Sequence, residues 1–169
     1  LNAYLRDSLT EKLPFRIRLT SGIHPDTYTY RVIRTYPHDI EAFTQGFEFH
    51  EGFMYEGTGN RGESSLRKVE LETGEILKFR NLDAELFGEG ITIINDKIYQ
   101  VTYTSQVGFV YNKNSFEELR RIYYQNKEGW GLTNNGSEIL MSDGSHVIYF
   151  MDTTYFSVQR KIEVFDNNG

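Results

Sequence analysis

The chain has 169 residues, of which 38% are hydrophobic and 25% charged, and its formal net charge is −6. This composition is typical of a soluble globular protein and excludes a disordered chain. Because the balance is acidic and no cluster of Lys and Arg stands out, we expect no nucleic-acid partner, and without ~18 consecutive apolar residues we expect no membrane span.

The first 27 residues differ from the rest. Residues 15–19 alternate apolar and charged side chains, as a half-buried strand does, and residues 21–26 are predicted to form a turn or linker. We interpret residues 1–27 as the tail of a preceding small β domain, or alternatively as an ordinary N-terminal extension. Residues 1–4 do not resemble a signal peptide. We expect an exported protein, periplasmic or secreted, whose signal lies outside this chain.

Residues 28–169 are predicted to form part of a β-propeller, an all-β fold. The segment Tyr28 to Arg34 is predicted to be a strand that completes the last blade of the ring. After it, Gly46, Gly90 and Gly131 close three similar motifs and lie 44 and 41 residues apart. This period is typical of propeller blades. Each glycine is therefore expected to begin the innermost strand of a four-stranded antiparallel blade.

Each repeat offers four strands, and an aromatic content of 15% also favours β structure. The predicted strands lie at 46–50, 53–58, 65–71 and 75–80, then at 90–94, 98–103, 107–111 and 119–123, and finally at 131–133, 139–141, 146–151 and 158–164. Rings typically need 4–8 blades to close. We therefore expect about three blades of a longer protein; the alternative is completion of the ring by a second copy of the chain.

The residues that precede the three glycines are Gln45, Glu89 and Trp130. Equivalent positions in successive blades lie at equivalent radii, so these side chains are expected to converge. Phe43 and Phe87 lie two residues before Gln45 and Glu89, on the same side of an extended segment. Aromatic neighbours would raise the pKa of Glu89 toward neutrality, as suits a proton shuttle. The alternative is that Glu89 only accepts hydrogen bonds from backbone amides, and that Trp130 is a core residue.

Other chemistries have weaker support. Hydrolysis of glycosides needs two carboxylates ~5–10 Å apart, but neither Glu56 nor Asp143 shares the repeat position of Glu89. The chain has no cysteine, and its four histidines lack metal-ligand spacing, so no metal site is expected. A non-catalytic propeller that binds peptides or partner proteins is the main alternative to an enzyme.

Several segments, in chain order, resemble the plant- and bacterial-type glutaminyl cyclases, also called glutamine cyclotransferases. The resemblance runs from about Tyr30 to the end of the chain. The segments that carry it are Tyr36-Pro37-His38-Asp39, Ala42-Phe43-Thr44-Gln45-Gly46, Glu56-Gly57-Thr58-Gly59, Gly62-Glu63-Ser64-Ser65-Leu66-Arg67, Phe87-Gly88-Glu89-Gly90, Gly129-Trp130-Gly131-Leu132 and Ser142-Asp143-Gly144-Ser145.

The resemblance implies a five-bladed β-propeller that converts N-terminal glutamine of peptides or proteins to pyroglutamate and releases ammonia, without a metal or other cofactor. It implies that Glu89 is the catalytic acid/base and that Phe43, Gln45, Phe87 and Trp130 line the substrate pocket. Tyr103 stands where the family usually has Trp, so it is expected to form an altered wall of the same pocket. The family also draws an Asn, a further Trp and a Lys from the last two blades, which we expect to lie outside this chain.

Overall fold

The structure, a computed structural model, describes residues 2–5, 8–12, 22 and 26–165. These residues contain strands and turns, and none of them belongs to a helix that could cross a membrane. The chain divides into two compact units, residues 1–34 and 35–169. In the first unit, β1 (Asn2–Leu5) pairs antiparallel with β2 (Ser8–Lys12). The predicted strand at 15–19 lies outside the described residues, and whether the propeller begins at residue 28 stays a prediction.

The prediction of a strand from Tyr28 to Arg34 is wrong for this structure, since residues 26–43 contain no strand. The side chains of Tyr28, Tyr30 and Ile33 are exposed. Alternating apolar residues indicate a strand only when a neighbouring strand offers its backbone hydrogen bonds and a surface to cover. In the described structure this segment buries neither face.

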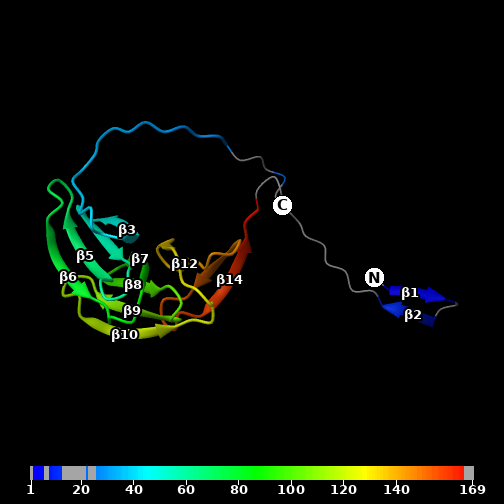
Figure 1. Cartoon of the computed structure of the whole chain (residues 1–169). Helices are drawn as coiled ribbons and strands as arrows, with labels where there is room; N and C mark the ends of the chain where they lie inside the picture. Colours follow the sequence, from blue (N-terminus) through cyan, green and yellow to red (C-terminus); the bar gives the residue numbers. More distant parts are fainter. Residues whose placement is uncertain (1, 6–7, 13–21, 23–25, 166–169) are drawn as a thin grey trace. The chain divides into compact units, whose positions relative to one another are not determined.

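The second unit consists of three four-stranded antiparallel sheets whose strands follow the chain order from the inner to the outer edge (Figure 1). Every strand lies within two residues of its predicted bounds. The first sheet contains β3 (Thr44–His50), β4 (Phe53–Thr58), β5 (Ser65–Glu70) and β6 (Ile76–Asn81); the second contains β7 (Gly88–Ile94), β8 (Lys97–Thr102), β9 (Val107–Asn112) and β10 (Glu118–Tyr123); the third contains β11 (Leu132–Asn134), β12 (Ile139–Ser142), β13 (Val147–Met151) and β14 (Val158–Glu163).

The repeated glycines lie within or directly before the innermost strands, although none is the first residue of its strand as predicted, and the structure shows why Gly46 and Gly90 are glycines. A Cβ atom on Gly46 would lie 2.5 Å from the backbone nitrogen of Ile91 in β7. One on Gly90 would collide with the carbonyl oxygen of Trp130, to which the Gly90 N–H donates a hydrogen bond of 2.8 Å. The three innermost strands therefore pack backbone against backbone, and Gly131 lies directly before the third of them.

A row of polar contacts connects the same three strands. Thr92 of β7 donates its hydroxyl to Glu48 of β3 at 2.8 Å and accepts a bond of 2.8 Å from the side-chain amide of Asn134 in β11. The backbone N–H of Ile93 also donates to Glu48, at 3.2 Å. Because Thr92 is fully buried, these bonds satisfy polar groups that would otherwise destabilise the interior.

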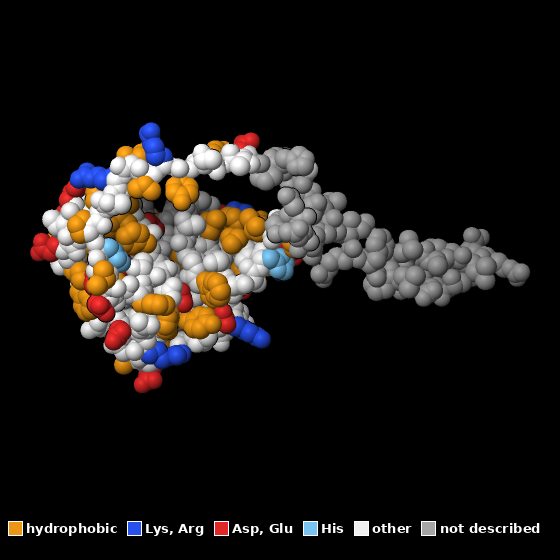
Figure 2. Space-filling view, turned by 45° about the horizontal axis from the view of Figure 1, so that its top comes forward, with side chains coloured by type: hydrophobic (Ala, Val, Ile, Leu, Met, Phe, Trp, Pro, Cys, Tyr) orange, Lys and Arg blue, Asp and Glu red, His pale blue; other side chains and the backbone are white. Residues whose placement is uncertain are grey.

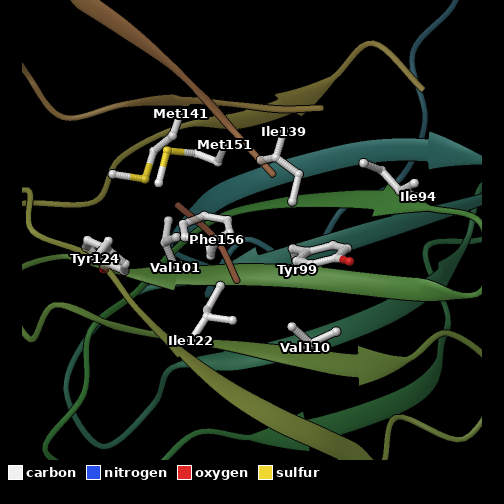
Figure 3. Packing of buried hydrophobic residues seen from close by; sticks show 10 residues of the cluster. All are labelled: Ile94, Tyr99, Val101, Val110, Ile122, Tyr124, Ile139, Met141, Met151 and Phe156. Atoms are coloured by element: carbon white, nitrogen blue, oxygen red, sulfur yellow. The ribbon is translucent and has the colours of Figure 1, made fainter. Parts of the chain in front are cut away.

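Two hydrophobic cores fill the spaces between neighbouring sheets. Tyr55 and Leu66 of the first sheet pack with Ile98 of the second. Figure 3 shows the other core, between the second and third sheets, with Phe156 near the centre of ten side chains. The alternation of side chains along β8 explains the division, since Ile98 contributes to one core and Tyr99 to the other. The middle sheet is therefore buried on both faces.

Candidate active site

Three aromatic side chains form a row at the start of the first two sheets. The ring of Phe87, the residue directly before β7, lies edge-on to Phe43 with 6.0 Å between centroids. On its other side it contacts Tyr103, also with 6.0 Å between centroids. The backbone supports this row, because the Tyr103 N–H donates to the Phe87 carbonyl at 2.9 Å. Phe43, Phe87 and Tyr103 thus lie together in the structure.

The side chain of Gln45 lies close to this aromatic row. Gly59, the residue after β4, is next to both Gln45 and Phe87. A Cβ on Gly59 would lie 2.5 Å from the ring of Phe87 and 3.1 Å from the side chain of Gln45. The Gly59 N–H also donates to the Phe43 carbonyl at 2.8 Å. Only a residue without a side chain leaves room here for both neighbours. Beside Phe43, which is 50% exposed, a cleft of about 310 Å³ opens.

Partly buried polar contacts anchor the segment that carries Phe43. Nε2 of His38 lies 2.9 Å from Oε1 of Glu56, a carboxylate that is almost completely buried in β4. Arg67 of β5 donates to Asp39 at 2.8 Å and lowers the pKa of that carboxyl. The contacts of His38 and Asp39 therefore hold the segment before Phe43 against the first sheet.

Glu89 lies in β7, two residues after Phe87, and is only 8% exposed. Burial, and after it the negative charge of Glu128, raises the pKa of Glu89 to about 7. Within the described part of the chain, no hydrogen bond to its carboxylate contributes to this shift. The alternative in which Glu89 accepts bonds from backbone amides is thus not supported, and its carboxyl can exchange a proton near neutral pH.

Trp130 lies two residues before β11, the first strand of the third sheet, and its backbone is held on both sides. Its carbonyl accepts from Gly90 at 2.8 Å, and its N–H donates to Ser142 at 3.0 Å. The indole packs on the backbone of Gly144, where a Cβ would lie 2.7 Å from the ring, and Nε1 donates to Glu128 at 2.8 Å. Trp130 remains 45% exposed beside a cleft of about 340 Å³, so it is not a core residue.

The surface around these clefts is mixed in character. On the face of the second unit seen in Figure 2, hydrophobic side chains gather in several separate patches, between charges of both signs. The cleft beside Trp130 also contains the acidic residues Glu128 and Asp143, together with Lys127. Each cleft thus combines aromatic surface, from Phe43 in one and Trp130 in the other, with a lining that is mostly polar or charged.

Sequence reasoning overlooked Glu128. The two other carboxylates that it considered are engaged elsewhere. Glu56 contacts His38, and Asp143 accepts from Asn126 at 2.8 Å and from its neighbour Ser145. Glu128 instead contacts Trp130 and acts electrostatically on Glu89. The available signal was its position in the third repeated motif, directly before Gly129 and Trp130.

In residues 26–165 no group of three His, Asp or Glu side chains is placed to hold a metal ion.

Comparison with known proteins gives a consistent result. The family model described as glutamine cyclotransferase matches residues 9–169, which extends the resemblance seen in the sequence toward the N-terminus. The chain is 35% identical over 131 residues to the glutaminyl-peptide cyclotransferase of Arabidopsis thaliana, covering 77% of this chain and 41% of that protein.

Among solved structures, the crystal structure of Myxococcus xanthus glutaminyl cyclase is similar, with a TM-score of 0.73 and 30% identity, over 80% of this chain and 56% of that one. The Neurospora crassa Pan2 WD40 domain shares the fold alone, with a TM-score of 0.58 and 11% identity, over 71% of this chain and 36% of that one.

The chain spans about two fifths of the Arabidopsis protein and just over half of the Myxococcus one. The match is nevertheless specific, because the family model covers most of the chain and one relative is 35% identical to it. The chain therefore belongs to the glutamine cyclotransferase family.

Proposed function

We propose that the protein converts N-terminal glutamine of peptides or proteins to pyroglutamate and releases ammonia. Family membership and the names of the Arabidopsis and Myxococcus relatives support this activity. In this reaction the substrate's α-amine attacks its own side-chain amide. Both groups belong to one residue, so holding them in a reactive conformation supplies much of the acceleration.

The observation that carries the proposal is the environment of Glu89. Its carboxyl is 8% exposed and has a pKa of about 7. A substrate α-amine has an ordinary pKa of about 7.7–8.0, so a base of this strength can take its proton as the amine attacks. The same carboxyl then returns the proton to the leaving nitrogen, which departs as ammonia.

The aromatic side chains suit the other half of the task, which is to hold a small uncharged group. Phe43, Phe87 and Tyr103 form a continuous apolar row, and the amide of Gln45 lies against it across Gly59. In our proposal this row and Trp130 hold the glutaminyl end and exclude water, which strengthens the electrostatic interactions of Glu89 with the reacting groups.

The test is the substitution Glu89→Gln in the full-length protein, with ammonia release from a Gln-initiated peptide as the readout. The amide keeps the shape but cannot accept the amine proton, so kcat should fall by ~10²–10⁴-fold. Glu117→Gln is the matched control, because Glu117 is an exposed carboxylate in the turn between β9 and β10. A Glu89→Gln protein that retains wild-type kcat would refute the proposed role of Glu89, whereas a wild-type protein that releases no ammonia would favour a peptide-binding propeller.

We also propose that the complete protein closes as a five-bladed ring. The outer faces of the sheets at either end of the unit support this. Phe47 and Phe49 are exposed on β3, as are Val158 and Ile162 on β14, and further blades would cover such surfaces. A structure of the full-length protein tests the number of blades.

Export is likewise our proposal, and fractionation of the source cells tests it.

A further inference from the structure

The orientation of the Trp130 indole depends on two contacts. Gly129 and Gly131 on either side contribute no side chain to hold it, and the residue is 45% exposed. One face of the ring packs on Gly144, whose φ of +79° is a conformation that favours glycine. The indole edge donates from Nε1 to Oε2 of Glu128 at 2.8 Å. Glu128 therefore determines how the ring is turned on its glycine support.

This hydrogen bond is of a strong kind. A carboxylate acceptor makes a charge-assisted bond, which is shorter and roughly twice as strong as a neutral one. Glu128 is partly buried, and the bond itself lies in an exposed position. Only one residue separates Glu128 from Trp130, and this residue is tightly placed. The Gly129 N–H donates to the Tyr103 carbonyl at 2.8 Å, and a Cβ there would lie 2.6 Å from the hydroxyl of Tyr124.

We propose that Glu128 is a positioning residue that orients the indole of Trp130 as a wall of the substrate pocket. This inference rests on the proposed function for its kinetic consequence. The backbone bond from Gly90 to Trp130 holds the main chain of Trp130 next to the strand that carries Glu89. An indole that turns away from Glu128 would loosen the wall for the glutaminyl side chain while the proton shuttle stays in place.

The kinetic test compares two substitutions of Glu128 in the full-length protein. Glu128→Ala removes the acceptor, and KM for a Gln-initiated peptide should rise about tenfold, the effect of losing one good hydrogen bond. Glu128→Gln keeps an oxygen that can accept from Nε1 in a neutral bond about half as strong, so KM should rise by no more than about threefold. In a Trp130→Phe background, which lacks the donor, Glu128→Ala should have no further effect on KM. Equal KM effects of Glu128→Ala in both backgrounds would overturn the proposal, as would equal effects of the Ala and Gln variants.

A second readout does not need catalysis. Trp130 is the only tryptophan of the 169 residues, and emission from any other source is removed by subtracting the Trp130→Phe protein. Quenching by acrylamide, a neutral molecule, should increase in Glu128→Ala and remain at the wild-type level in Glu128→Gln and in the control Glu117→Ala. Unchanged quenching in Glu128→Ala would refute the positioning role. If the wild-type protein lacks cyclotransferase activity, the proposed function fails, and the quenching experiment still decides the role of Glu128.

Discussion

Burial of Glu89 connects the chemistry of this residue to the stability of the fold. A carboxylate that is 8% exposed with a pKa of about 7 is suited to proton transfer. The same burial makes its charged form unfavourable in the folded protein, whereas the unfolded chain solvates the charge. The residue therefore contributes most to stability in acid and least above neutral pH.

This relation predicts how Glu89→Gln changes stability with pH. The folded pKa is raised above the ordinary value of 4.5, so the wild-type protein loses stability as pH rises through about 7. The neutral amide has no such dependence. Melting curves should coincide at pH values below the ordinary pKa, and at pH 8 the variant should be more stable by about 1–3 kcal/mol. A Glu89→Gln variant that is less stable than wild type at pH 8 would contradict the buried-charge explanation. The control Glu117→Gln should differ from wild type by the same small amount at low pH and at pH 8.

At this level the sequence predicted the site in part. The repeat position lies in β3 for Gln45, in β7 for Glu89 and just before β11 for Trp130, and the structure connects these strands by backbone contacts. The partner of the Trp130 indole could not be predicted in the same way. Glu128 precedes the repeat position, and its contact depends on the rotamer that Gly144 supports from another loop.

Among the strands, β3, β7 and β11 are the elements that position the site. They are joined by close backbone packing at Gly46 and Gly90 and by the polar row from Glu48 through Thr92 to Asn134. Glu89 lies within β7, and Trp130, two residues before β11, is tied to β7 by the N–H of Gly90.

The polar row gives a prediction about stability. Thr92→Val keeps the shape of the side chain but removes the hydroxyl that connects Glu48 with Asn134. Both partners then lose a bond in a buried place, so the free energy of unfolding should fall by about 1–3 kcal/mol. Thr133→Val, at an exposed position of β11, makes the same chemical change and should stay within about 0.5 kcal/mol. Chemical denaturation measures both; equal effects would show that the polar row adds no stability.

The strands themselves were the most predictable part of the fold, because turn residues and a repeated glycine delimit each one. The segment from Tyr28 to Arg34 shows the limit of this reasoning. Its alternation is as regular as that of the true strands, yet it forms none in the described structure. A pattern within one segment carries no information on whether another strand is present to pair with it.

Taken together, the three sheets form two cores, and the middle sheet is covered on both faces. Ionisable groups that often bind metals are dispersed through this unit. His38 contacts Glu56, His50 lies 3.0 Å from the ammonium of Lys113, and His146 packs against Phe165. None of these three histidines belongs to the aromatic row of Phe43, Phe87 and Tyr103 or contacts Glu89 in the described structure.

This dispersion predicts that cyclisation by the full-length protein does not depend on a metal. Incubation with a strong chelator followed by dialysis should leave the rate of ammonia release from a Gln-initiated peptide unchanged, since Glu89 can transfer the proton without a Lewis acid. A parallel sample that receives zinc after dialysis is the control. Loss of activity on chelation with recovery on adding zinc would contradict the prediction.

The backbone contacts at Gly46 and Gly90 have a consequence for redesign of this protein. Where main chain meets main chain, the separation of neighbouring strands does not vary with the choice of side chains. Substitutions in the outer strands can therefore repack the cores without changing the dimensions of the pocket. Efforts to accept a different N-terminal residue would do best to vary Phe43, Tyr103 and the loop that carries Gly144, and to leave the innermost glycines as they are.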